Sequence, residues 1–283
     1  MNQFKYFQFA SPFQSQRMVT TIADVDNYWE DASGENTGRS WQFFDDSLND
    51  YWKQYGSPSG YRGKSYSPII PIDIDTPSTE NLFRVLDKLG NQIGDLQDIN
   101  LFFSGKKGYH IEIPSGYFGI EPSDNLPERM KAMVTMMNID ADLSLYKANQ
   151  LYRMNNSLNV DGGYYKTQLD YQDIVDGIQL EDIKCLASKP TAHSFEMYDL
   201  PDIQKRNWLV DLWDKTECPD NTTLKVSGGV TEGYRNANAY DTALSLKTQE
   251  YGKETAYKRG TEREEQPSRG KFEGITVNSR FSL

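Results

Sequence analysis

The chain has 283 residues, of which 37% are hydrophobic and 13% aromatic, a composition typical of a folded protein with a polar surface. The mean hydropathy of -0.72, with no apolar run near the roughly 20 residues of a spanning helix, excludes an integral membrane protein. The formal net charge of -11 argues against a protein that coats nucleic acid without specificity, but not against an enzyme with a local basic groove.

The first 65 residues mix aromatic and polar side chains. They lead into the stretch SPSGYRGKSYSP (57–68), whose glycines and prolines predict a loop. The run IIPIDIDTP (69–77) is apolar, rich in isoleucine and closed by a proline. This pattern predicts a buried strand.

A helix is expected over residues 79–90, because its leucines recur at helical spacing. Ser78 or Thr79 could cap its start, and Gly90 would end it. Further elements are expected in this order: strands at 99–105 and 109–114, a helix at 127–137 and a strand at 164–170. Mixed strands and helices in this order indicate an α/β or α+β domain.

The character of the chain changes after about residue 195. Residues 202–215 and 232–252 read as helices, and the tail from about residue 253 is charged and poor in large aliphatic side chains. We therefore predict a catalytic domain at 1–195 and a helical module with a flexible charged tail at 196–283.

The two cysteines, Cys185 and Cys218, are expected to be free thiols in a cytoplasmic protein, because the N-terminus lacks the order of a secretion signal. A structural zinc site needs about four Cys or His ligands at short spacings. With His110 and His193 the chain offers four such residues, widely scattered, so we expect no zinc.

Asp73 and Asp75 lie two apart on the strand predicted at 69–77. They would share one face, roughly 6–7 Å apart, while Ile72 and Ile74 would face the core. Two carboxylates at the end of a buried strand can hold a pair of divalent ions. The alternative is a helix cap or turn, since Asp-Thr-Pro often starts one.

The stretch SGKKGYH (104–110) lies between two predicted strands. Its two glycines let backbone N–H groups turn toward an anion, and its lysines add positive charge. The alternative is a basic hairpin turn with His110 satisfied in the core. Farther along, Asp142 precedes Arg153 by 11 positions, which could add one metal ligand and one phosphate contact, although Asp140 and Asp142 could equally be surface acids.

Taken in order, the acidic pair, SGKKGYH and a lone Asp142 before LYR resemble the archaeo-eukaryotic primase superfamily over residues 66–170. SGKKGYHIEI is the most specific part. The segment LYRMNNSLN, followed by YYKTQ, is similar to the family's Arg-x-Pro-x-Ser-x-His/Asn segment with its following Lys-Thr. Asn155 stands where proline is usual, and Asn159 fills the His/Asn place.

The resemblance implies an RRM-like primase-polymerase core, acting as a monomer in phage or plasmid DNA replication. It would join NTPs or dNTPs on a single-stranded DNA template, with or without a primer strand. Asp73, Asp75 and Asp142 would be catalytic and bind two Mg²⁺ or Mn²⁺ ions. The residues expected to hold the nucleotide are Ser104, Gly105, Lys106, Lys107, Gly108, His110 and Arg153. Residues 231–244 are similar to the helical module that follows such cores, which often continue into a helicase.

The sequence gives fewer indications of which residues would contact the nucleic acid. Tyr61, Arg62 and Lys64 combine aromatic and basic side chains in one loop, which suits a single strand as well as it suits a plain surface loop. Further contacts are expected from Asn156, Ser157 and Lys166. Two alternatives stay open: a replication initiator or nucleic-acid-binding module without catalysis, and a metal-dependent nucleotide hydrolase. The sequence does not distinguish NTPs from dNTPs, or priming from extension.

Overall fold

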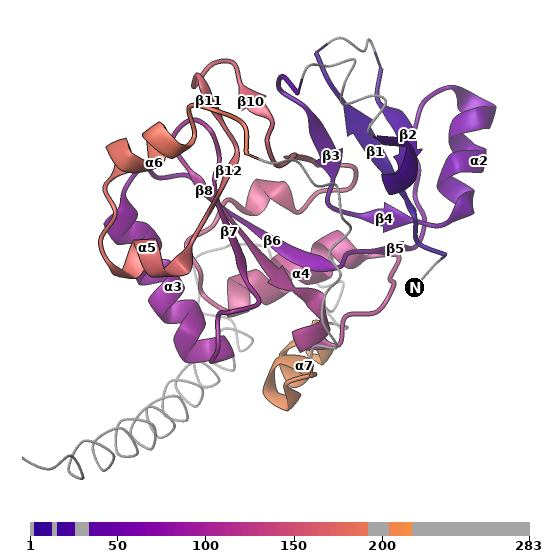
Figure 1. The fold of residues 1–283 in the computed structure, drawn as a ribbon. Coiled ribbons are helices and arrows are strands. Elements are labelled where there is room, and N and C mark those ends of the chain that lie inside the picture. Colours follow the sequence, from indigo (N-terminus) through magenta and orange to yellow (C-terminus); the bar gives the residue numbers. More distant parts are fainter. Residues whose placement is uncertain (1–2, 13–15, 26–33, 192–203, 217–283) are drawn as a thin grey trace, which may run out of the picture. The chain divides into compact units, whose positions relative to one another are not determined.

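The computed structural model describes residues 3–12, 16–25, 34–191 and 204–216 (Figure 1). The chain divides into two units, residues 1–229 and 230–283, and every described residue belongs to the first. The expected helix at 232–252, the charged tail, Cys218 and His193 lie outside the described residues. Cys185 is a free, exposed thiol.

A four-stranded antiparallel sheet carries the predicted motifs. Its order is β12 (Thr167–Leu169), β7 (Asn100–Phe103), β8 (Tyr109–Pro114) and β6 (Ile69–Ile74). Alternate residues of a strand face opposite sides. Ile72 and Ile74 are therefore buried on one face, as expected, while Asp73 and its cross-strand partner His110 face the other side.

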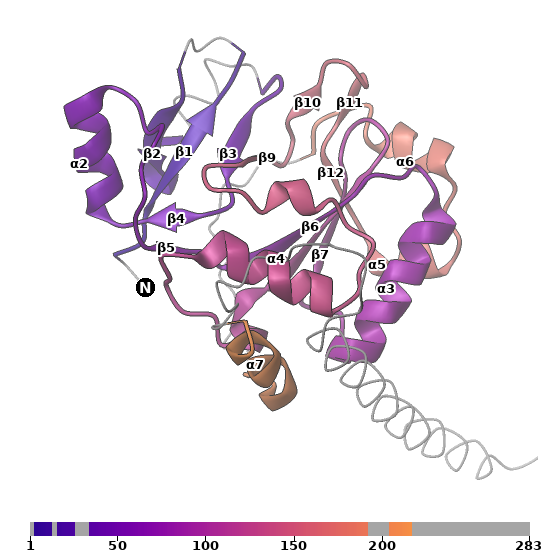
Figure 2. The ribbon, with the colours of Figure 1, turned by 180° about the vertical axis from the view of Figure 1, so that it is seen from behind.

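Helices α3 (Thr79–Ile93) and α4 (Leu126–Met136) flank this sheet (Figure 2). Ser78 caps α3 by accepting a hydrogen bond from the backbone N–H of Asn81, which confirms the expected start. The expected stop at Gly90 is wrong. The helix continues because Ile93 is buried on the same side as Leu89, and it ends at Gly94, whose φ is 93°.

The first third of the chain forms a second sheet together with one later strand, and the sequence did not predict this sheet. Its order is β5 (Ser65–Tyr66), β4 (Phe43–Phe44), β1 (Tyr6–Ala10), β3 (Gly38–Ser40) and β9 (Leu151–Arg153), with β2 (Met18–Thr21) paired to β1. Helix α2 (Asp46–Tyr55) packs against β1 and β2. Part of the predicted loop at 57–68 is therefore a strand, because Ser65–Tyr66 completes the edge of this sheet.

The strand expected at 164–170 is divided at Lys166. Its first part, β11 (Tyr164–Tyr165), pairs with β10 (Leu158–Asn159), and its second part, β12, pairs with β7.

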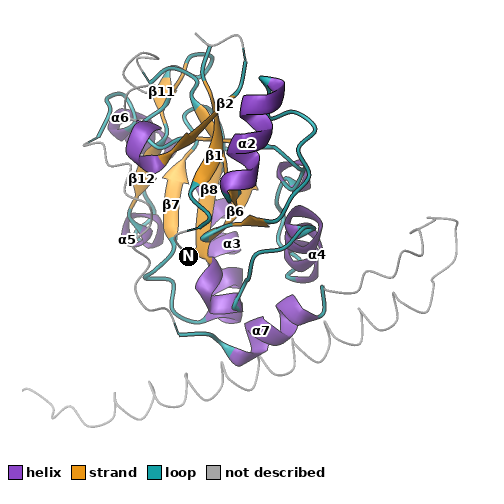
Figure 3. Cartoon of the chain, turned by 90° about the vertical axis from the view of Figure 1, so that its right-hand side faces the viewer, coloured by secondary structure: helices purple, strands orange, loops and turns teal. Residues whose placement is uncertain are grey.

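The remaining described elements are η1 (Ser115–Phe118), η2 (Leu143–Leu145), α5 (Tyr171–Val175), α6 (Leu180–Leu186) and α7 (Asn207–Asp214). In Figure 3 the strands run through the middle, with α5 and α6 to their left and α2 and α4 to their right. Antiparallel sheets flanked by helices make this part of the chain an α+β fold.

Helix α7 confirms part of the helix expected at 202–215 and contacts η1 and α4. The domain boundary near residue 195 stays a prediction. None of the described helices has both the length and the apolar character that a membrane crossing requires.

Candidate active site

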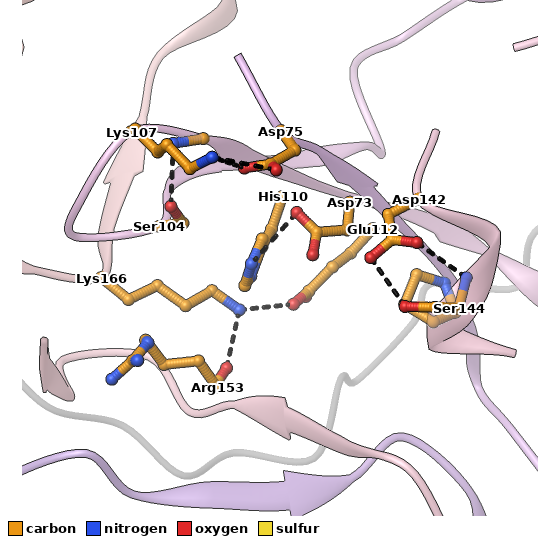
Figure 4. A network of polar contacts seen from close by, with 12 residues as sticks. Asp73, Asp75, Ser104, Lys107, His110, Glu112, Asp142, Ser144, Arg153 and Lys166 are labelled. Atoms are coloured by element: carbon orange, nitrogen blue, oxygen red, sulfur yellow. Dashed lines mark hydrogen bonds and ion pairs between the residues drawn. The ribbon is translucent and has the colours of Figure 1, made fainter. Parts of the chain in front are cut away.

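Asp73 lies at the centre of the predicted site (Figure 4). It stands directly opposite His110 in the ladder between β6 and β8, and its Oδ1 is 3.7 Å from His110 Nε2. The backbone N–H of Asp142 donates to the Asp73 carbonyl at 2.8 Å, which brings the loop before η2 alongside β6. The structure thus places two acids that are 69 positions apart in the sequence next to each other.

The electrostatics of Asp73 reflect this crowding. Burial, together with the neighbouring carboxylates of Asp142 and Asp75, raises the pKa of Asp73 from 3.8 to about 6, while Lys166 and Lys107 act in the opposite direction. A divalent cation beside Asp73 would relieve the repulsion between these carboxylates.

Asp142 is held in one orientation by its own loop. Its carboxylate accepts hydrogen bonds from the backbone N–H of Ser144 at 2.8 Å and from the Ser144 hydroxyl at 2.7 Å. These hydrogen bonds lower the pKa of Asp142, so its carboxylate is ionised near neutral pH. Asp142 therefore combines two roles, an N-cap of η2 and a negative charge beside Asp73.

The Asp75 carboxylate is paired with a lysine of the SGKKG loop. Its carboxylate oxygens both lie 3.0 Å from Lys107 Nζ, in an exposed ion pair (Figure 4). Within the described part of the chain, no three His, Cys, Asp or Glu side chains form a group that could hold a metal ion. Asp73 and Asp142 do fit a hard cation, because both offer carboxylate oxygens and their mutual repulsion is only partly offset by Lys166 and Lys107. Asp75 is paired with Lys107 instead.

The SGKKG loop is a closed turn between β7 and β8. The Ser104 N–H donates to the Gly108 carbonyl at 2.9 Å, and the Gly108 N–H donates to Ser104 Oγ at 3.1 Å. Gly105 has a φ of 89°, and a Cβ there would lie 2.6 Å from the Tyr164 carbonyl oxygen, so only glycine fits. Lys106 Nζ lies 3.8 Å from Asp161.

His110 is buried between the two sheets. Its ring stacks on that of Tyr152 from β9, with 4.4 Å between centroids and 25° between planes. Burial, Lys166 and Arg153 hold the pKa of His110 well below 6.5, so the imidazole is neutral. Its Nδ1 is buried and makes no hydrogen bond, an exception among buried polar atoms of the described residues.

Arg153 ends β9, half-buried, on the N-terminal sheet. Its Nη1 donates to Asn36 Oδ1 at 3.0 Å and to the Leu158 carbonyl at 3.4 Å. The positive charges of Arg153 and Lys166 both act on His110. The structure therefore brings His110 and Arg153 near each other from different sheets.

The residues expected to contact nucleic acid differ in exposure. Tyr61 is buried, packs edge-on against Phe44 and Tyr51, and hydrogen-bonds Ser47, so it offers no face for a base. Arg62 and Lys64 are exposed. Lys64 lines a polar pocket of about 680 Å³, which includes none of the three predicted catalytic acids.

Asn156, Ser157 and Lys166 are buried as well. Asn156 Oδ1 accepts hydrogen bonds from the N–H and the hydroxyl of Thr191, and Ser157 Oγ accepts one from the Thr37 N–H. Each of these side chains is thus occupied inside the protein instead of facing a nucleic acid.

Three residues near the site were missed from the sequence: Glu112, Tyr152 and Arg39. Glu112 is buried and lies 3.1 Å from Lys166 Nζ. Its place two residues after His110 on a strand is a signal that could have revealed it. Tyr152, which stacks on His110, and its cross-strand partner Arg39, whose charge acts on Lys166, belong to the N-terminal sheet, and no local pattern indicated that they lie near the site.

The sequence matches no known protein family. No curated protein is similar to it either. Among solved structures, the polymerase domain of ligase D from Mycobacterium tuberculosis, in complex with DNA, matches with a TM-score of 0.40 and 12% identity, over 64% of this chain and 70% of that chain. A likeness this distant assigns neither family nor activity to the chain.

Proposed function

We propose that this chain is a template-directed nucleotidyltransferase, a DNA primase or polymerase with an RRM-like core, acting in phage or plasmid DNA replication. The observation that carries the proposal is the crowding of Asp73, whose raised pKa comes from burial and from the carboxylates of Asp142 and Asp75. Such a half-buried acid cluster, next to a basic loop and a neutral histidine, suits a site for cations and a triphosphate.

Asp73 and Asp142 would hold Mg²⁺ or Mn²⁺, with Asp75 as a further ligand. Metal ions bound there would lower the pKa of the primer 3′-hydroxyl and stabilise the leaving pyrophosphate. The hydrogen bonds from Ser144 keep Asp142 ionised and oriented for this role. The protein contributes positioning and electrostatics, because phosphoryl chemistry of this kind needs no covalent intermediate with a side chain.

The triphosphate would lie against the SGKKG loop, His110 and Arg153. The neutral His110 ring lies beside Asp73, and Arg153 offers the geometry for bidentate phosphate contact. Lys107 is tied to Asp75 in the present state. A nucleotide with its cations would let both change partner, Lys107 turning to phosphate and Asp75 to a cation.

The deciding experiment incubates the full chain with a single-stranded DNA template, Mg²⁺ or Mn²⁺, and labelled NTPs or dNTPs in separate reactions, each with and without a primer. A nucleotidyltransferase yields a labelled strand, and the primer-free reactions reveal whether synthesis starts de novo. Hydrolysis of the nucleotide without a strand product would identify a nucleotide hydrolase. No reaction, with retained DNA binding, would identify a binding module.

Variants connect the product to the proposed acids. Asp73→Asn and Asp142→Asn should each abolish strand synthesis, whereas Asp87→Asn, an exposed acid on α3, should leave it unchanged. Binding of Mn²⁺, followed by electron paramagnetic resonance, should weaken in the first two variants alone. Strand synthesis at the wild-type rate in Asp73→Asn would refute the assignment.

A further inference from the structure

Lys166 occupies the break between β11 and β12, and its backbone is fixed on both sides. Its N–H donates to the Ser157 carbonyl and its carbonyl accepts from the Asn156 N–H, both at 2.9 Å. The side chain is only 1% exposed. A lysine is rarely buried to this degree without a specific partner, so its surroundings call for an explanation.

The partners of its ammonium group come from both sheets. Lys166 Nζ donates to Glu112 Oε1 of β8 at 3.1 Å and to the Arg153 carbonyl of β9 at 3.1 Å. It also lies 4.5 Å from the ring centroid of Phe102 on β7 and 4.2 Å from that of Tyr152 on β9. One side chain therefore connects the four-stranded sheet to the N-terminal sheet.

On β9, Lys166 contacts Tyr152 and Arg153, which lie where the triphosphate is proposed to bind. Tyr152 stacks on His110, and the Arg153 carbonyl fixes the backbone from which the guanidinium extends. In Figure 4, His110 and Glu112 both point toward Lys166. Displacement of the ammonium group would release Tyr152 and Arg153 together.

We propose that Lys166 is a positioning residue: with Glu112 as its counter-ion, it holds Tyr152 and Arg153 on one sheet against His110 on the other. It does not bind phosphate itself, because its ammonium group is enclosed and already hydrogen-bonded to Glu112 and to the Arg153 carbonyl. The role in nucleotide binding rests on the proposed function, whereas the link between the sheets does not.

The test uses NMR of the full chain at one fixed pH. His110 and His193 are the only histidines in the sequence, so a His193→Ala background isolates the imidazole signals of His110. Stacking on Tyr152 gives these signals a ring-current shift. Lys166→Met and the isosteric Glu112→Gln should both reduce that shift, while Lys131→Met, which removes an exposed lysine of α4, should not.

Binding of dATP in the presence of Mg²⁺ supplies the second readout. Both Lys166→Met and Glu112→Gln should raise its Kd, by roughly 10-fold to 100-fold, the range found for residues that orient metal ligands. A direct phosphate ligand would behave differently: Lys166→Met would weaken dATP binding, but the His110 signals would stay in place and Glu112→Gln would bind normally. That pattern overturns the proposal.

The two proposals fail separately. If the chain makes no strand and binds no dATP, yet the His110 signals move in both variants, the link between the sheets stands and the proposed function falls. If Lys166→Met does not fold, Glu112→Gln decides alone, and unchanged His110 signals in that variant overturn the positioning role.

Discussion

Replacement of Asp73 by asparagine should stabilise the metal-free protein above neutral pH. The pKa of Asp73 rises from 3.8 to about 6 on folding, chiefly because of burial. One pKa unit corresponds to about 1.4 kcal/mol, so a shift of about 2 units sets a ceiling of about 3 kcal/mol. The side chain keeps 32% of its exposure, and solvent screening reduces the expected effect to about 1–2 kcal/mol.

The sign follows from proton binding. The native state holds this proton more tightly than the unfolded state, so the stability that the proton contributes is complete below pH 4 and is lost as pH rises through about 6. Asparagine carries no charge at any pH. The free energy of unfolding of Asp73→Asn should therefore exceed that of the wild type by about 1–2 kcal/mol at pH 8 and lose this excess at pH 4.

Urea unfolding in EDTA at pH 4 and pH 8 measures this difference, with Asp87→Asn as the exposed control. The comparison between variants cancels the titration of the groups that do not interact with Asp73. A loss of stability at pH 8, or a difference that does not depend on pH, would refute the view that Asp73 is held under electrostatic strain. Addition of Mn²⁺ at pH 8 should stabilise the wild type and leave Asp73→Asn unaffected, because the cation needs this carboxylate.

Three further predictions concern residues that stabilise the fold around the site. Glu112→Gln leaves the Lys166 charge buried without its counter-ion and should cost about 3–5 kcal/mol in urea unfolding, whereas replacement of both residues by methionine should cost less. Gly105→Ala should lower both the melting temperature and the affinity for dATP, because the new Cβ would collide with the Tyr164 carbonyl. Leu86→Ala in α3 should cost about 2–5 kcal/mol by opening a cavity, with unchanged dATP affinity in the folded fraction.

Local sequence patterns predicted those elements of the fold that are each formed by one continuous run of residues. β6, α3 and β8 were each marked by a continuous run with clear punctuation, and their bounds differ from the expected ones by a few residues at most. The N-terminal sheet was not predictable in this way. Its strands are two to five residues long, and pairs such as Arg39 with Tyr152 join distant parts of the chain.

The same distinction between predicted and unpredicted parts applies to the candidate site. The order of the motifs predicted that Asp73, His110 and Asp142 belong together, and the structure brings them onto neighbouring elements. The burial of Lys166 was not predictable, because its partner Glu112 lies 54 positions away and lysine is usually exposed. Sequence order thus predicted which of these groups lie near one another, whereas the side chains that support them became visible only in the assembled sheets.

The ion pairs of the SGKKG loop affect the rate at which an anion reaches the site. Lys107 and Lys106 each face an acid in the described structure, Asp75 and Asp161, and the whole chain carries a net charge of -11. The protein as a whole therefore repels a polyanion at long range. Added salt weakens that repulsion: at 0.1 M, charges more than about 10 Å apart are largely screened from each other. Moderate ionic strength should consequently speed the arrival of a nucleotide, opposite to the usual behaviour of basic DNA-binding proteins, whose capture of a ligand slows as salt is added.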